Sequence, residues 1–135
     1  MSKGIGGSAR IVMQDVNTVI YEYYAYDLDN EACRNPEHIY DGTITIDKRS
    51  LVESEIHEKL KKLPKGRKKL ITKRVLCDVD FSSRIAAGQI SVENSKFCWK
   101  FLDNDIGMIA MHLIWKIFRL YQTEGTIPET VGYHV

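Results

Sequence analysis

Cys33 and His38, five residues apart, are the pair in this chain that most resembles a catalytic nucleophile and its base. Such a pair needs a third group that orients the base. Glu31 and Glu37 are close in sequence, but the spacing matches no family-specific motif. The pattern therefore favours an ordinary loop cysteine beside a solvated histidine, and no catalytic residue is predicted.

Metal ligation is the second chemistry to consider. Glu53 and His57 are four residues apart, a spacing that could chelate a cation from one face of a helix. No HExxH motif accompanies them, and the chain offers no converging set of His, Cys and carboxylate ligands. A surface helix pair is the favoured interpretation, so no metal is predicted.

Two pairs of aspartates offer an alternative. Asp78 and Asp80 would share one face of a strand, roughly 7 Å apart by strand rise. Asp103 and Asp105 come just before an apolar helix pattern. If the four carboxylates met, they could hold a divalent cation, which would define a small metal-assisted enzyme. A solvated strand face and helix-capping acids explain the same residues more simply.

The glycine-rich N-terminal segment does not have the pattern of a phosphate-binding loop. Gly4, Gly6 and Gly7 precede a predicted strand instead of linking a strand to a helix, and no GK[ST] follows them. No cofactor is predicted.

The charge distribution is the most unusual compositional feature. Net charge is +1, yet residues 59–74 contain nine cations and no acid, whereas residues 1–58 sum to −6 and 75–135 to −2. Such a segment bears on partners and not on fold, because it concentrates positive charge wherever the backbone runs. The candidate partner-binding residues in it are Lys61, Lys62, Lys65, Arg67, Lys68 and Lys69.

Four tyrosines in residues 18–26 complete the candidate partner-binding set: Tyr21, Tyr23, Tyr24 and Tyr26. Strand alternation puts Tyr21 and Tyr23 on one face and Tyr24 and Tyr26 on the other. Tyrosine is enriched at protein–protein interfaces and can also stack on nucleobases. Aromatic residues on strands are nevertheless more often packing residues, so this set is a hypothesis about exposed rings.

The periodicity predicts strands over residues 9–14, 18–26 and 43–46, a capped helix over 50–63, strands over 69–81 and 97–101, and a helix from 103 or 104 to about 122. Ser50 and Glu53 read as a capping box for the first helix. The order βββαββα predicts an α+β fold, with a mainly antiparallel sheet of about five strands and two helices packed on one face.

Length and composition predict one domain over residues 1–135, with a loose N-terminus at 1–7 and a C-terminal tail at 125–135. Three irregularly spaced cysteines and no apolar leader favour a cytoplasmic protein with reduced thiols. No stretch is apolar enough to predict membrane insertion. The helix at 104–122 is apolar around most of its circumference, which makes it a core helix or a homodimer interface.

No stretch matches a family signature. The sequence favours a non-catalytic protein-binding or regulatory module, of the small inhibitor or toxin-neutralising type, acting through the basic segment and the tyrosine-rich hairpin. The alternatives are a nucleic-acid-binding accessory protein and the metal-assisted enzyme with clustered aspartates. A protein partner is favoured over nucleic acid because charge alone does not distinguish polyanions and no nucleic-acid signature is present.

Overall fold

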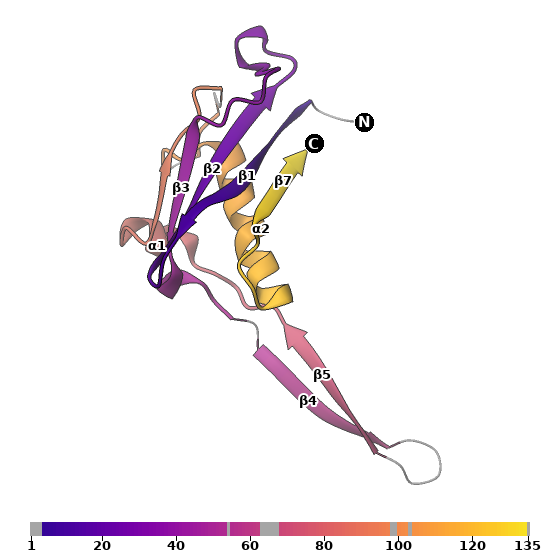
Figure 1. The fold of residues 1–135 in the computed structure, drawn as a ribbon. Helices are drawn as coiled ribbons and strands as arrows, with labels where there is room; N and C mark the ends of the chain where they lie inside the picture. The colour runs from indigo at the N-terminus through magenta and orange to yellow at the C-terminus, as the bar shows by residue number, and fades with distance from the viewer. Residues whose placement is uncertain (1–3, 54, 63–67, 98–99, 103, 135) are drawn as a thin grey trace.

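A five-stranded antiparallel sheet in the order β6-β3-β2-β1-β7 forms the body of the protein (Figure 1). The computed structural model describes residues 4–53, 55–62, 68–97, 100–102 and 104–134. The sheet strands are β1 (Ile5–Gln14), β2 (Thr18–Asp27), β3 (Gly42–Asp47), β6 (Ile90–Glu93) and β7 (Thr130–His134). Strands β4 (Glu55–Lys62) and β5 (Lys68–Val75) pair only with each other, as a separate two-stranded ribbon.

One face of the sheet is covered by the long helix α2 (Met108–Glu124), which lies behind β1 and β2 in Figure 1. Alternation along the strands supplies the core face of the sheet: Val19, Tyr21, Tyr23 and Ala25 of β2 are fully buried. Helix α2 ends at Gly125, whose φ of 75° is the left-handed conformation that glycine adopts without strain. None of the described helices is long and apolar enough to cross a membrane.

The predicted α+β class is confirmed: the protein has a five-stranded antiparallel sheet and two α-helices. The hairpin over 9–14 and 18–26 is present as β1 and β2, the strand at 43–46 as β3, and the long second helix as α2. The other helix, α1 (Phe81–Ala86), is short and packs Phe81 edge-on against Phe118 of α2, with ring centroids 5.0 Å apart.

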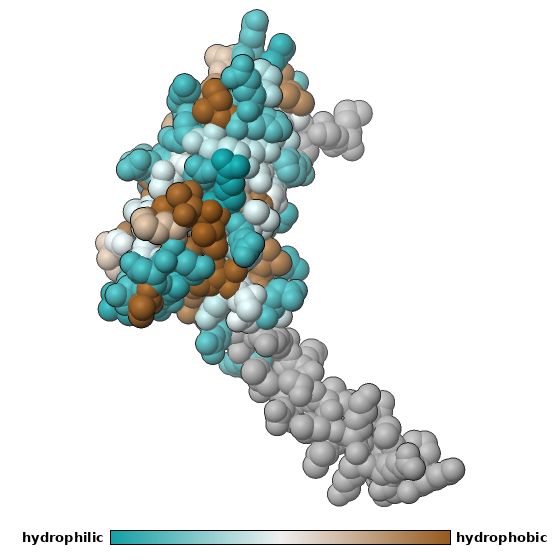
Figure 2. Space-filling view, viewed as in Figure 1, coloured by the Kyte–Doolittle hydropathy of each residue, from teal (hydrophilic) through white to brown (hydrophobic). Residues whose placement is uncertain are grey.

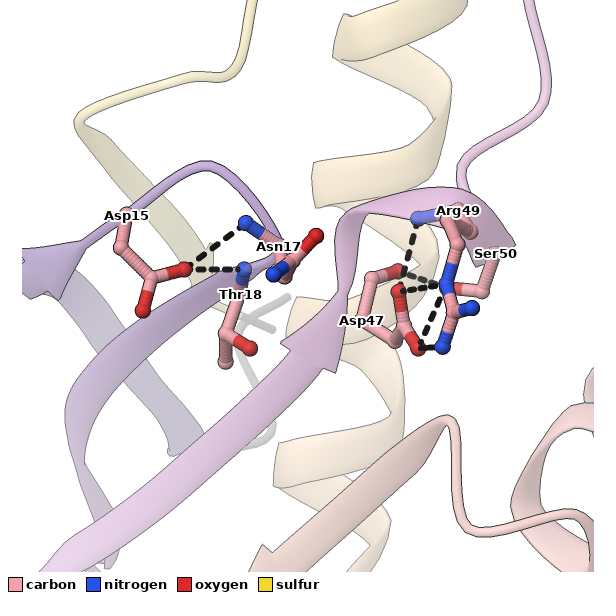
Figure 3. A network of polar contacts seen from close by, with 6 residues as sticks. All are labelled: Asp15, Asn17, Thr18, Asp47, Arg49 and Ser50. Atoms are coloured by element: carbon pink, nitrogen blue, oxygen red, sulfur yellow. Dashed lines mark hydrogen bonds and ion pairs between the residues drawn. The ribbon is translucent and has the colours of Figure 1, made fainter.

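The prediction of a helix over residues 50–63 is wrong. Ser50 ends a short 3₁₀ turn, η2 (Lys48–Ser50), and its hydroxyl donates back to the Asp47 carbonyl at 2.6 Å, so it does not open a helix. Asp47 also accepts from the backbone N–H of Arg49 and pairs with its guanidinium, as Figure 3 shows. Ser50 is thus engaged in this turn, and the chain continues into β4. The spacing of Ile56 and Leu60 fits a strand period of two as well as a helix.

A second local turn sets the register of the first hairpin. The Asp15 carboxylate accepts from the backbone N–H groups of Asn17 and Thr18, both at 2.8 Å (Figure 3). These two bonds hold the pKa of Asp15 below its ordinary value. The turn aligns β1 with β2, apart from an irregularity between Ile11 and Met13.

Other segments differ in detail from the prediction. The strand expected over 69–81 ends at Val75, and Phe81 begins α1. The predicted strand at 97–101 falls partly outside the described residues; Phe101 forms an isolated bridge with Gly107. The segment 125–135, expected as a tail, contains β7, and residues 5–7 of the expected loose N-terminus belong to β1. Pairing of β7 with β1 places His134 opposite Gly6.

Candidate partner-binding surfaces

The ribbon formed by β4 and β5, here called the arm, projects from the body of the protein (Figure 1). Its register places Lys61 opposite Lys69 and Lys62 opposite Lys68. The structure thus brings four of the six predicted basic residues together in two facing pairs. Lys65 and Arg67 lie outside the described residues.

The root of the arm is tied to α2 by the side chain of Gln122. Gln122, 3% exposed, accepts from the backbone N–H of Cys77 at 2.6 Å and donates to its carbonyl at 2.9 Å. Cys77 lies two residues beyond the end of β5. Gln122 therefore pairs with this segment much as a neighbouring strand would, and it fixes where the arm leaves the body.

Replacing Gln122 by Leu is expected to lower the free energy of unfolding by about 2 kcal/mol, because two backbone groups of Cys77 lose their partner while apolar bulk is retained. Urea unfolding followed by circular dichroism measures this. Gln14→Leu, at the exposed end of β1, is the matched control and should change stability by less than about 0.5 kcal/mol. Equal stability of the two variants would contradict the anchoring role.

Tyr21 and Tyr23 do not belong to a contact surface, because both rings are fully buried. The hydroxyl of Tyr21 donates to the Pro128 carbonyl at 2.5 Å, and burial raises its pKa. The hydroxyl of Tyr23 accepts from the backbone N–H of Ser95 at 2.8 Å. The candidate set is corrected accordingly: these two tyrosines hold the core together. Of the other two, Tyr24 is 7% exposed and Tyr26 is half-buried.

Tyr24 and Tyr26 lie on the face of the sheet opposite α2, within a group of near-parallel rings. The His38 ring stacks on Tyr24, with centroids 4.5 Å apart and planes 8° apart. The ring of His134, from the last strand, lies 6.0 Å from that of Tyr26, and its Nδ1 is hydrogen-bonded to the Tyr26 hydroxyl at 2.9 Å. Tyr40 meets Tyr24 edge-on, and the Arg10 guanidinium lies 3.8 Å from the centre of the Tyr40 ring.

These rings border a pocket of about 490 Å³, here called the aromatic pocket. Its wall combines Tyr24, Tyr26, His38 and His134 with Leu28, Arg34 and Pro36. Sequence reasoning missed His134 and gave His38 a different role. No local signal could have found them, because Tyr26 and His134 are 108 residues apart and meet only through the β1–β7 pairing.

The nucleophile hypothesis for Cys33 finds no support in its surroundings. Cys33 is buried, and burial together with the nearby Asp27 carboxylate raises the pKa of its thiol. A raised pKa keeps the sulfur protonated and unreactive. His38, the histidine considered as its base, stacks on Tyr24 instead.

We expect Cys33 to react with iodoacetamide at least about tenfold more slowly than the half-buried Cys77 in the folded protein, because its thiolate is scarce and shielded. Mass spectrometry of peptides after timed labelling gives the rate for each cysteine. In 6 M guanidinium, as the unfolded control, the two rates should converge. Native labelling of Cys33 as fast as that of Cys77 would show that the thiol is accessible.

The aspartates predicted as an alternative metal site do not gather among the described residues. Asp80 is the N-cap of α1, where it accepts from the backbone N–H of Ser83 at 3.1 Å. Asp105 precedes α2 in a left-handed conformation, with φ of 61°, and Asp103 lies outside the described residues. No group of three His, Cys, Asp or Glu side chains that could hold a metal occurs in the described part of the chain.

Glu53 and His57 do not lie on a helix in the structure. Glu53 lies before β4 and interacts with Tyr121 of α2, raising the pKa of that phenol after the larger effect of its burial. His57 lies within β4, where the register pairs it with Lys73. A chelating pair on one helix face is therefore excluded for these two residues.

The apolar circumference of α2 is accounted for within one chain. Its buried residues include Ile109, Leu113, Ile114, Ile117 and Phe118, whereas Trp115 is 41% exposed. Because the core itself covers most of the helix, its composition no longer requires a second subunit. A homodimer through 104–122 stays a prediction, to be tested by sedimentation equilibrium.

Exposed hydrophobic residues also gather away from α2. Figure 2 shows brown, hydrophobic surface among teal, hydrophilic residues on the face seen in Figure 1. Val12, Met13 and Val16, at the turn end of β1 and β2, are each more than half exposed. They are a further candidate contact surface that the sequence analysis did not single out.

The fold and these surfaces define a small α+β protein that carries a basic ribbon on an otherwise acidic chain. No protein-family model, curated protein or solved structure matches the chain. Its function is therefore argued from its own geometry.

Proposed function

We propose that this protein is a non-catalytic binding module of the cytosol that captures an acidic protein partner with its arm. The observation that carries the proposal is the arm itself: a two-stranded ribbon that pairs with no strand of the sheet and whose residues from 59 to 74 include nine cations and no acid. A projecting ribbon can enter a concave partner surface, and its charge can steer the encounter.

The charge of the remaining chain supports protein over nucleic acid. Residues 1–58 and 75–135 sum to −6 and −2, so the arm is the basic part of an acidic protein. A long polyanion bound at the arm would run past this acidic body and be repelled by it. A protein with one acidic groove would contact the arm alone.

A cytosolic setting fits the two described cysteines, Cys33 and Cys77, which are both free thiols. Regulation or inhibition by steric capture is the mode of action that suits a small module with a projecting charged ribbon.

Affinity capture from lysate of the native host, with and without nuclease, tests the proposal. A stoichiometric protein that survives nuclease and elutes at moderate salt is the expected result. Capture that disappears with nuclease would overturn the protein proposal in favour of nucleic acid. Recovery of the bait alone at low salt would contradict both.

Nucleic acid is the second candidate, because the major groove of B-DNA admits a two-stranded β-ribbon. It predicts binding to duplex DNA whose affinity falls linearly with salt on logarithmic axes, with a slope close to the number of phosphates neutralised. The protein proposal predicts weak duplex binding without sequence preference. Fluorescence anisotropy across a salt series separates the two.

A further inference from the structure

The aromatic pocket is not used by the proposed function. It is built from β2, the loop 28–41 and β7, whereas the arm leaves the opposite end of the molecule (Figure 1). Its volume of about 490 Å³ is that of a small-molecule site, for which about 300–1,000 Å³ is typical.

The rings of the pocket share an orientation. The plane of His38 is 8° from that of Tyr24 and 17° from that of Tyr26, and the Tyr26 plane is 27° from that of His134. At centroid distances of 4.5–6.3 Å these rings stack on one another, so a flat aromatic ligand would stack on an outer face of the group and not between its rings. Such stacking tolerates any base because every base has a π-face.

The charged and polar groups of the pocket favour an anion. Arg34 supplies a guanidinium and His38 and His134 supply imidazoles, while no carboxylate is among the described lining residues. The Arg34 Nε donates to the Leu28 carbonyl at 3.1 Å, which orients the guanidinium. Its terminal nitrogens make no hydrogen bond to the described residues, so they can donate to a phosphate as a planar pair.

The loop that lines the pocket is fixed by a buried asparagine. Asn35 is 2% exposed; its amide donates to the Ala25 carbonyl at 3.1 Å and its side-chain oxygen accepts from the Ile39 N–H at 2.9 Å. This bridge fastens the loop to β2. It also supports His38 at a positive φ of 50°, an uncommon conformation outside glycine. A site arranged in advance loses less entropy when it binds a ligand.

We propose that the aromatic pocket binds a nucleotide, with the base stacked on its rings and the phosphate on Arg34. The nucleotide can be free or part of a single strand, because both present the same base and phosphate. This site is independent of the arm and of its protein partner.

Titration calorimetry of the full-length protein with AMP, GMP, CMP and UMP, and with the matching nucleosides, tests the site. We expect nucleotides to bind at least about tenfold more tightly than nucleosides, since a hydrogen bond to a charged group is lost with the phosphate. Arg34→Gln should reduce nucleotide affinity to that of the nucleoside. Arg119→Gln, an exposed arginine on α2, is the matched control and should bind as the wild type.

His38→Asn tests the stacking contribution. Asparagine accepts the positive φ of this position, so the loop conformation can be kept while the ring is removed. Nucleotide and nucleoside affinities should both fall about tenfold. Unchanged thermal unfolding of the variant confirms that the loss reflects the ring.

A hexanucleotide distinguishes the two sources of the ligand, measured in a protein whose arm lysines 61, 62, 68 and 69 are changed to Glu. Tighter binding than a mononucleotide indicates a single strand, and equal binding a free nucleotide. Three results would overturn the proposal: no mononucleotide or hexanucleotide binding at millimolar concentration, wild-type affinity in both Arg34→Gln and His38→Asn, or loss of mononucleotide binding on changing the arm. The proposed function of the arm would stand in each of these cases.

Discussion

Reversing the charge of Lys61, Lys62, Lys68 and Lys69 to Glu is expected to reduce partner capture on the order of a hundredfold or more. These residues stand opposite each other in the register of the arm, and the change lowers the charge of residues 59–74 from +9 to +1. Against an acidic partner, four attractive contacts become repulsive, and charge pairs of this kind affect both the encounter rate and the lifetime of a complex. Surface plasmon resonance against the captured protein measures the loss.

The fold should survive this change. Strands β4 and β5 pair with each other and with no strand of the five-stranded sheet, so the core does not depend on them. Lysines stand opposite each other at these two register positions in the wild type, and glutamates do so in the variant. The number of like-charged pairs across the ribbon is therefore unchanged. We expect the unfolding midpoint of the body to remain within a few degrees of the wild type.

A smaller pair of variants provides a matched control. Lys61→Glu with Lys69→Glu changes the net charge by the same amount as Lys96→Glu with Arg119→Glu, two exposed positions on the body. The arm pair should lose about tenfold in affinity and the body pair less than about twofold. If both pairs lose equally, net charge and not the arm governs capture; if the quadruple variant still binds normally, the arm is not the contact.

The strands of the sheet could be predicted where the alternating pattern of side chains was accompanied by residues that favour a turn. Residues 18–26 carry β-branched and aromatic side chains, and Asp15 to Asn17 offers a turn, so β1 and β2 follow from local rules. The assignment of Tyr21 and Tyr23 to one face and Tyr24 and Tyr26 to the other is confirmed. Which face is buried could not be read from this segment, because tyrosines occupy both.

The arm was mispredicted because two patterns coincide at Ser50 to Leu63. The capping box requires the Ser50 oxygen to accept from a backbone N–H, but its hydroxyl donates to Asp47, three residues earlier. That choice depends on the turn around Asp47 and on Arg84, whose Nε donates to the Ser50 carbonyl at 2.8 Å. Contacts between residues 34 positions apart lie beyond any reading of local periodicity.

The aromatic pocket shows the same limit at longer range. Tyr24 and Tyr26 were candidates from their spacing, but the rings that complete the pocket come from a polar loop and from the last strand. His38 was considered because of its short distance in sequence from Cys33. Cys33 is buried, and the His38 ring stacks on Tyr24 instead. Chain topology, more than composition, decides which of the histidines meet the tyrosines.

Gly42→Ala is expected to have the largest effect on stability, lowering the free energy of unfolding by about 3 kcal/mol. A Cβ at this first residue of β3 would lie 2.2 Å from one carbon of the Tyr23 ring and 2.5 Å from another. The ring cannot move away easily, because it is fully buried and its hydroxyl is held by the Ser95 N–H at 2.8 Å. Either the ring shifts and that bond breaks, or β3 separates from β2.

Urea unfolding of Gly42→Ala against Gly132→Ala measures this effect. A Cβ at Gly132 would first meet Nε2 of His134, at 3.2 Å, a contact that a shift of a few tenths of an ångström relieves, so this control should stay within about 1 kcal/mol of the wild type. The double variant Gly42→Ala with Tyr23→Leu identifies the cause. Because the smaller side chain relieves the overlap, its loss of stability should be clearly less than the two single losses combined. Simple additivity, or a Gly42→Ala protein as stable as the control, would show that Tyr23 does not require glycine beneath its ring.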